Sequence, residues 1–293
     1  MDTDYLSGRM AESRAEIVRG ASTPRWAEVV FRHPVWSALV LLAFVFAFQQ
    51  FVPRLLLSGI GGSVYAREAR DLIGEGLAAL LVLAIVLALG WWRTVGLAGP
   101  LARGTLKLAW FPALMIVVLF MLQAQQSQFE FDAKWLSIAV PNVFLVGFFE
   151  EVLTRGLVLL PLLVAWRSRP NGVLMAVMVS SLMFGLAHLI NLFNGAELGT
   201  TLVQVGYAFG FGVGFAALLL RTNTIWLGIV LHALVDANGI WFGPSSGDGS
   251  GTGDEATSII PLLLVGLPLL VYGLVLLRKR KPSEQPTEER VTA

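Results

Sequence analysis

The sequence predicts an all-α polytopic membrane protein in which about eight transmembrane helices enclose a polar cavity within the bilayer. Two observations support this fold class. The 293 residues are 56% hydrophobic and 14% charged, and the apolar residues form long runs between Pro34 and Leu277 instead of short alternating patterns. The few charged and histidine residues inside those runs indicate that the helices surround a polar space.

The apolar runs divide into segments of the right length, because a membrane-spanning helix needs about 20 mainly apolar residues. Helices are expected throughout, since open strands leave backbone groups unpaired in lipid. In the fourth segment, Pro141 and Pro161 are expected to trim or bend the helix. The predicted segments are 35–57, 72–92, 105–122, 136–166, 172–191, 200–220, 224–241 and 258–277.

The chain is expected to hold one membrane domain, 34–278, between an N-terminal tail, 1–33, and a basic C-terminal tail, 279–293. The N-terminal tail carries five arginines and is too long and charged for a cleaved signal peptide. With both tails cytoplasmic, 16 Lys and Arg residues lie on the inner side and four on the outer side. Positive residues stay cytoplasmic during insertion, so we expect a multi-pass plasma-membrane protein with both termini inside.

Composition also excludes several classes of chemistry. The chain has no cysteine, which rules out disulfides, thiolate metal sites and a cysteine nucleophile. A net charge of +1 gives no signal for nucleic-acid binding. The expected partners are therefore the lipid bilayer and a peptide or protein substrate, and no feature of the sequence predicts an oligomeric state.

Three charged residues stand inside the fourth apolar segment, where each charge costs several kcal/mol unless it has a partner or a function. Glu151 and Arg155 are four residues apart, so they share a helix face and can pair. Glu150 points about 100° away from them and is left unpaired. We therefore predict that Glu150 is a general base and that Glu151 and Arg155 form a supporting ion pair.

Two of the three histidines also lie inside predicted segments. His188 is in the fifth segment, one helical turn after Phe184. His232 is in the seventh and precedes Asp236 by four residues, which puts both side chains on one face. A single intramembrane histidine often only joins two helices, but two of them with unpaired carboxylates predict one shared polar site.

This set of side chains can hydrolyse an amide bond in two ways. Glu150 with His188 can deprotonate a water molecule, while His232 with Asp236 can stabilise the oxyanion that forms when the water attacks a carbonyl group. Alternatively, the same four residues can act as ligands of a zinc ion that keeps one position open for water. The sequence leaves both routes open.

The order of these motifs resembles the CPBP intramembrane proteases, which comprise CAAX-processing endopeptidases and bacteriocin-processing or self-immunity proteins. The matching residues are EExxxR (Glu150, Glu151, Arg155), FxxxH (Phe184, His188) and HxxxD (His232, Asp236). The resemblance implies eight membrane helices around a conical cavity, water activation by Glu150 and His188, and an oxyanion site at His232 and Asp236. Eukaryotic prenyl-protein proteases have asparagine where this chain has Asp236, so that residue must be protonated, orient His232 or bind metal.

The leading hypothesis is therefore an intramembrane endopeptidase that cleaves membrane-associated or lipidated peptides with a Glu/His-activated water, or one bound to metal. A proton-coupled transporter would also place carboxylates and histidines at midplane, but the sequence has no internal repeat and no matching pair of broken helices. A non-enzymatic immunity or scaffold protein would use the same polar cluster only to hold helices together.

Overall fold

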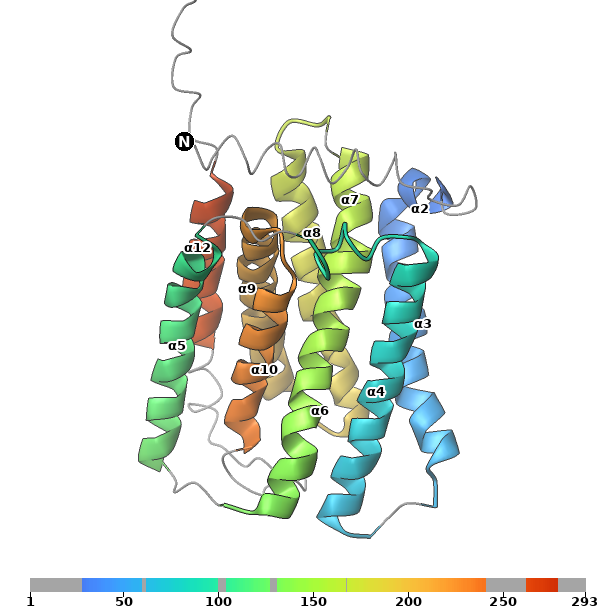
Figure 1. The fold of residues 1–293 in the computed structure, drawn as a ribbon, viewed down its shortest axis with the longest axis vertical. Helices are drawn as coiled ribbons and strands as arrows, with labels where there is room; N and C mark the ends of the chain where they lie inside the picture. Colours follow the sequence, from blue (N-terminus) through green and yellow to red (C-terminus); the bar gives the residue numbers. More distant parts are fainter. Residues whose placement is uncertain are drawn as a thin grey trace, which may run out of the picture.

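The computed structural model describes residues 28–59, 62–99, 104–126, 131–166, 168–240 and 262–278. These residues form helices that run roughly side by side, with no strand among them (Figure 1). The elements are α2 (Glu28–Arg32), α3 (Pro34–Leu56), α4 (Val64–Ala88), α5 (Thr105–Gln126), α6 (Ala133–Glu151), the π-helix η2 (Val152–Val158), α7 (Leu159–Trp166), α8 (Gly172–Ala187), the 3₁₀-helix η3 (His188–Asn194), α9 (Leu198–Thr222), α10 (Trp226–Ile240), the π-helix η5 (Leu262–Gly266) and α12 (Leu267–Leu277).

The helices confirm the all-α membrane class. Five stretches in the described part of the chain are long and apolar enough to cross a bilayer: Pro34–Leu56, Val64–Ala88, Thr105–Leu122, Gly172–Asn194 and Leu198–Thr222. Two shorter apolar helices are Trp226–Ile240 and Leu263–Leu277. Each predicted segment overlaps one or more helices, while the number of eight membrane crossings stays a prediction.

Tails at the two ends of the chain were predicted from charge. Residues 1–27 and 279–293 lie outside the described residues, so most of both predicted tails does too. Within the predicted N-terminal tail, Glu28–Arg32 forms the short helix α2, which packs against α3 and α7. Pro34 occupies the first turn of α3, where its missing N–H leaves no bond unmade.

The elements α6, η2 and α7 form one continuous helical segment from Ala133 to Trp166. At 1.5 Å per residue it is about 50 Å long, which exceeds the hydrocarbon thickness of about 30 Å. Pro141 and Pro161 were expected to trim or bend this helix; both lie inside helical turns, so neither trims it, and a bend stays a prediction. Its backbone changes at Val152–Val158 instead, where the hydrogen-bonding pattern becomes that of a π-helix.

Side-chain caps fix the starts of two helices at one end of the bundle. The Ser63 hydroxyl accepts from the Ala66 N–H at 3.2 Å, and the Asp132 carboxylate accepts from the Trp135 N–H at 2.9 Å. Asp132 also accepts from the Tyr65 hydroxyl, which joins the starts of α4 and α6. The hydrogen bond from Tyr65 is the main reason why the pKa of Asp132 is lower than its ordinary value, and the bond from the Trp135 N–H adds to this effect.

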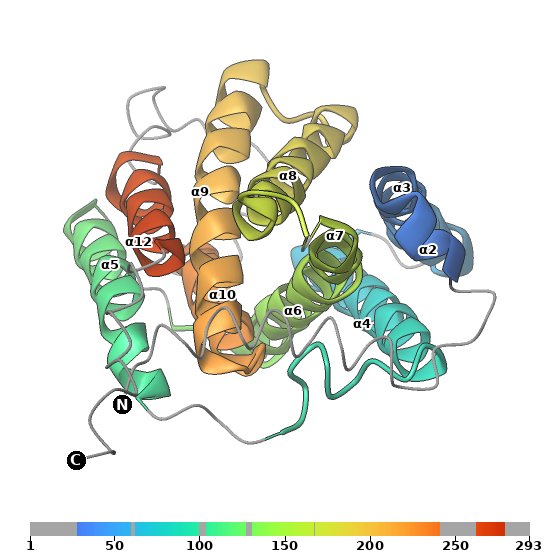
Figure 2. The same cartoon turned by 90° about the horizontal axis from the view of Figure 1, so that it is seen from above.

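The core of the bundle is built on α6 and α9. Helix α6 packs against α4 and α10, and α9 packs against α8 and α12 (Figure 2). Glycine permits the closest approach of α6 to α10, because a Cβ on Gly147 would lie 2.9 Å from the Ile229 carbonyl oxygen. This close contact positions the C-terminal end of α6 beside the middle of α10, where the polar residues of both helices lie.

Candidate active site

The EExxxR motif lies where α6 passes into the π-helix η2. Glu150 and Glu151 are the last residues of α6, and Arg155 is in the middle of η2. The Thr154 hydroxyl donates to the Glu150 carbonyl oxygen at 2.6 Å, which satisfies one backbone acceptor in the altered turn. Single π-turns inside α-helices occur frequently at functional sites, since they change the direction in which side chains leave the helix.

Glu151 and Arg155 form the predicted ion pair, with 3.1 Å between Glu151 Oε2 and Arg155 Nε. Both side chains are almost completely buried, at 1% and 3% exposure. The guanidinium also donates to the Thr154 hydroxyl and lies 4.6 Å from the centre of the Phe184 ring. A buried ion pair needs such additional partners, because each charge loses its hydration.

The second oxygen of Glu151 binds His232, a contact that the sequence did not predict. Glu151 Oε1 lies 3.0 Å from His232 Nδ1, so that nitrogen carries the proton and donates to the carboxylate. Gly228 makes room for this carboxylate, because a Cβ there would lie 2.9 Å from Glu151 Oε2. Arg155, Glu151 and His232 therefore form a buried chain of contacts that fixes the imidazole ring from behind.

The other nitrogen of His232 faces two further carboxylates. His232 Nε2 lies 3.6 Å from Glu150 Oε2 and 3.6 Å from Asp236 Oδ2, both longer than a hydrogen bond. These two carboxylate oxygens are buried and have no hydrogen-bond partner among the described residues. Both oxygens can therefore accept a hydrogen bond from a water molecule or from a substrate group.

His188 is held at the junction of α8 and η3. Its Nδ1 lies 3.0 Å from the Phe184 carbonyl oxygen. A carbonyl can only accept, so Nδ1 carries the proton and Nε2 of the neutral ring has a free lone pair. The Phe184 ring packs edge-on against the imidazole at a centroid distance of 5.0 Å, which fixes its plane. His188 is thus arranged to accept a proton at Nε2.

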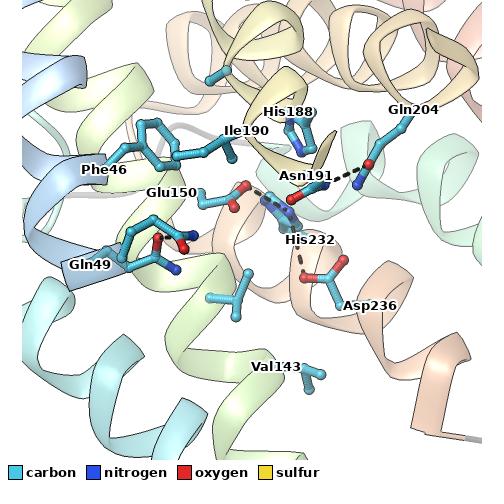
Figure 3. A pocket seen from close by; sticks show the side chains of 13 residues that line it. Phe46, Gln49, Val143, Glu150, His188, Ile190, Asn191, Gln204, His232 and Asp236 are labelled. Carbon is cyan, nitrogen blue, oxygen red and sulfur yellow. Dashed lines mark hydrogen bonds and ion pairs between the residues drawn. The ribbon is translucent and has the colours of Figure 1, made fainter. Parts of the chain in front are cut away.

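These side chains surround a cavity of about 250 Å³. Figure 3 shows Glu150, His188, His232 and Asp236 around it, with side chains from α3, α6, η3, α9 and α10. One water molecule occupies about 30 Å³ in the liquid, so the cavity has room for several waters or for a short part of a peptide. Glu150 and His188 come from segments distant in the sequence, and packing brings both to this one space.

Comparison with protein families gives a match over the part of the chain that carries the site. Residues 132–238 match the family described as Type II CAAX prenyl endopeptidase Rce1-like. The matched stretch contains all three motifs and the helices that carry them. This match supports the resemblance to the CPBP family over the stretch that carries the motifs. No curated protein matches the chain, and no solved structure matches it.

The match to this family supports protease activity of the CAAX type in general, and the apolar helices support a multi-pass membrane protein. Of the six site residues predicted from the sequence, the structure places four on the cavity wall: Glu150, His188, His232 and Asp236. The remaining two, Glu151 and Arg155, lie behind His232 as its support. The predicted polar cavity is therefore present, and the catalytic roles of the six residues stay predictions.

The zinc alternative requires at least three ligand atoms around one point. Histidine and carboxylate are suitable donors for zinc. However, no group of three or more His, Asp and Glu side chains within the described ranges meets the geometry of a metal site. The side chains of this site are thus not arranged as a zinc shell, and a metal ion at Glu150, His188, His232 and Asp236 stays a prediction.

The sequence reasoning missed the amide side chains of the cavity and a buried carboxylate behind them. Gln49 and Gln50 on α3, Asn191 on η3 and Gln204 on α9 line the cavity. Glu75 lies in the predicted segment 72–92, and its charge within an apolar run was the same signal that identified Glu150. The amides had no such signal, because neutral polar residues occur near the ends of many membrane helices.

Proposed function

We propose that the protein is an intramembrane endopeptidase that hydrolyses peptide bonds of membrane-associated or lipidated peptides. The observation that carries this proposal is the Glu150 carboxylate, whose Oε2 makes no hydrogen bond in the described structure and which shares a cavity of about 250 Å³ with His188 and His232. A peptide bond needs an activated nucleophile and a stabilised oxyanion, and these side chains can provide both. The match to a CAAX prenyl endopeptidase family points to a prenylated C-terminal peptide as the first substrate to test.

In the proposed mechanism, Glu150 accepts one proton from a water molecule as the water oxygen attacks the carbonyl carbon of the substrate, while His188 Nε2 accepts a hydrogen bond from the other O–H of that water. His188 Nε2 is the free acceptor of its ring, and Glu150 Oε2 has no competing hydrogen bond in the described structure. The carbonyl oxygen becomes an oxyanion. When the tetrahedral intermediate collapses, the C–N bond breaks and the same proton passes to the leaving amine.

His232 is proposed to stabilise the oxyanion. Its Nδ1–H is committed to Glu151, so only the protonated imidazolium offers a second donor, at Nε2. Glu150, Glu151 and Asp236 all lie within 3.6 Å of this ring and favour its positive form. An ionised Asp236 would repel an oxyanion directly, so its proposed role is to orient His232.

The decisive experiment compares Glu150→Gln and His188→Ala with the wild type in proteoliposomes. The substrate is an internally quenched, farnesylated peptide with a C-terminal CAAX motif, and the same peptide without the lipid tests the need for prenylation. We expect each variant to lose at least about 100-fold in kcat, because each removes a proton acceptor. Glu197→Gln and His33→Ala are matched controls, since neither residue lines the cavity.

Retained cleavage by Glu150→Gln or His188→Ala would refute this mechanism. A variant that no longer cleaves but still protects cells in an immunity assay would instead favour the non-enzymatic alternative. The plasma-membrane location and the cytoplasmic position of both termini remain proposals from the charge distribution, and reporter fusions at each terminus would test them.

A further inference from the structure

Four amide side chains line two walls of the cavity, on either side of the proposed catalytic groups. Gln49 and Gln50 come from α3, and Asn191 and Gln204 come from η3 and α9. Figure 3 shows Gln49 on one side of Glu150, with Asn191 and Gln204 on the other. The proposed reaction gives none of these four residues a role.

Hydrogen bonds fix the orientation of the amides on α3. Gln49 Nε2 donates to Glu75 Oε1 at 2.6 Å, and Gln50 Nε2 donates to Gln49 Oε1 at 3.3 Å. A carboxylate oxygen accepts, so Glu75 determines which end of the Gln49 amide faces it. That choice then determines the orientation of Gln50, whose Oε1 and second N–H are left for the cavity.

Burial of the Glu75 carboxylate within a membrane helix costs free energy. Its Oε2 is buried without a hydrogen-bond partner, and in the described structure no Lys, Arg or His lies within ion-pair distance of its carboxylate. A carboxylate inside a membrane helix costs several kcal/mol, and a single hydrogen bond from a neutral amide offsets only part of that cost. The effect that the structure does show is the fixed orientation of the two glutamine amides.

The opposite wall is ordered in a similar way. Asn191 Nδ2 donates to Gln204 Oε1 at 2.8 Å, which leaves Asn191 Oδ1 as an acceptor at the cavity. An amide side chain has the same donor and acceptor groups as a peptide bond. The cavity therefore presents groups complementary to a main chain on both sides of Glu150.

We propose that Gln50 and Asn191 bind the main chain of an extended substrate peptide on the two sides of the scissile bond, with Glu75 and Gln49 as positioning residues. This inference rests on the proposed function. A peptide that enters a membrane-embedded site loses its hydration, so its N–H and C=O groups need new partners. Amides that pair with the main chain select an extended segment and tolerate different side chains.

The test separates the acceptor role of Glu75 from a role of its charge. Glu75→Leu and Gln50→Leu should raise KM for the farnesylated CAAX peptide about tenfold each, with kcat changed less than about threefold, since both remove binding common to the ground state and the transition state. Glu75→Gln keeps an oxygen that accepts from Gln49 and should behave like the wild type. Glu68→Leu is the control, because Glu68 lies on the same helix, bonds Asn142 and does not line the cavity.

A second experiment measures peptide binding in a variant that does not cleave. In a Glu150→Gln background, the affinity for a fluorescent form of the same peptide should fall about tenfold with Glu75→Leu or Gln50→Leu and stay unchanged with Glu75→Gln. If Glu75→Leu fails to fold, Gln50→Leu alone decides, since Gln50 is only half-buried.

Two results would overturn the inference. One is unchanged KM and affinity in Gln50→Leu. The other is a loss in Glu75→Gln as large as in Glu75→Leu together with an altered pH profile of kcat, which would make Glu75 a proton carrier. If the wild-type protein cleaves no peptide, the proposed function is refuted instead. The affinity measurement then still tests whether Gln50 and Glu75 contribute to peptide binding.

Discussion

Replacement of Gly228 by alanine tests the contact on which the site geometry depends. A Cβ at this position would lie 2.9 Å from Glu151 Oε2, which itself lies 3.1 Å from Arg155 Nε. To reach ordinary contact distance, the carboxylate must move by about 0.5 to 1 Å. Its other oxygen lies 3.0 Å from His232 Nδ1, so the movement disturbs the ion pair and the imidazole together.

The expected magnitude follows from two opposing effects. Overpacking in a buried site costs about 1–3 kcal/mol. Alanine gains up to about 1 kcal/mol over glycine in a helix. Gly239→Ala is the matched control on the same helix, because a Cβ there meets nothing within 4 Å and only the gain remains. We therefore expect Gly228→Ala to be about 1–3 kcal/mol less stable than Gly239→Ala.

The assays are unfolding in detergent and cleavage of the farnesylated peptide. A misplacement of up to about 1 Å in a catalytic group can lower the rate about 100-fold, so Gly228→Ala should lose about 10- to 100-fold in kcat while Gly239→Ala keeps wild-type activity. If the two alanine variants are equally stable and equally active, Glu151 is not held against α10 as described, and the support proposed for His232 fails with it.

Three further predictions concern charge. Arg155→Met removes the guanidinium from the buried Glu151 carboxylate and should reduce the free energy of unfolding by about 3–5 kcal/mol, while the double variant with Glu151→Gln should recover part of that loss in the same unfolding assay. The depressed pKa of Asp132 adds stability that is present above its ordinary pKa of 3.8 and is lost as the pH falls through the depressed value. Tyr65→Phe removes the main cause of that depression, so it should lose less stability than the wild type between about pH 5 and about pH 2, and equal losses would contradict this role of Tyr65. Dialysis against a chelator should leave cleavage unchanged, since no described group of side chains has metal-site geometry. A loss of activity that added zinc restores would show instead that a metal ion activates the attacking water.

Local sequence patterns were sufficient for the fold class and for most of the candidate site. Apolar runs of membrane-spanning length predict helices because lipid offers backbone groups no other partners. The four-residue spacing of Glu151 and Arg155 predicted an ion pair, and the two side chains lie 3.1 Å apart. The cost of charge in a bilayer identified Glu150 as a residue that needs a function.

Only the tertiary structure decided how these residues meet. The contact of Glu151 with His232 and the presence of Glu150 and His188 at one cavity depend on how separate helices pack. The π-helix at Val152–Val158 was not predicted from the sequence either. Helix spacing relates residues within one helix and carries no information on the depth or rotation of its neighbours. For the same reason, the two hydrogen bonds that connect Glu75, Gln49 and Gln50 could not be predicted from the sequence. They join α3 to α4 through side chains that become neighbours only in the folded bundle.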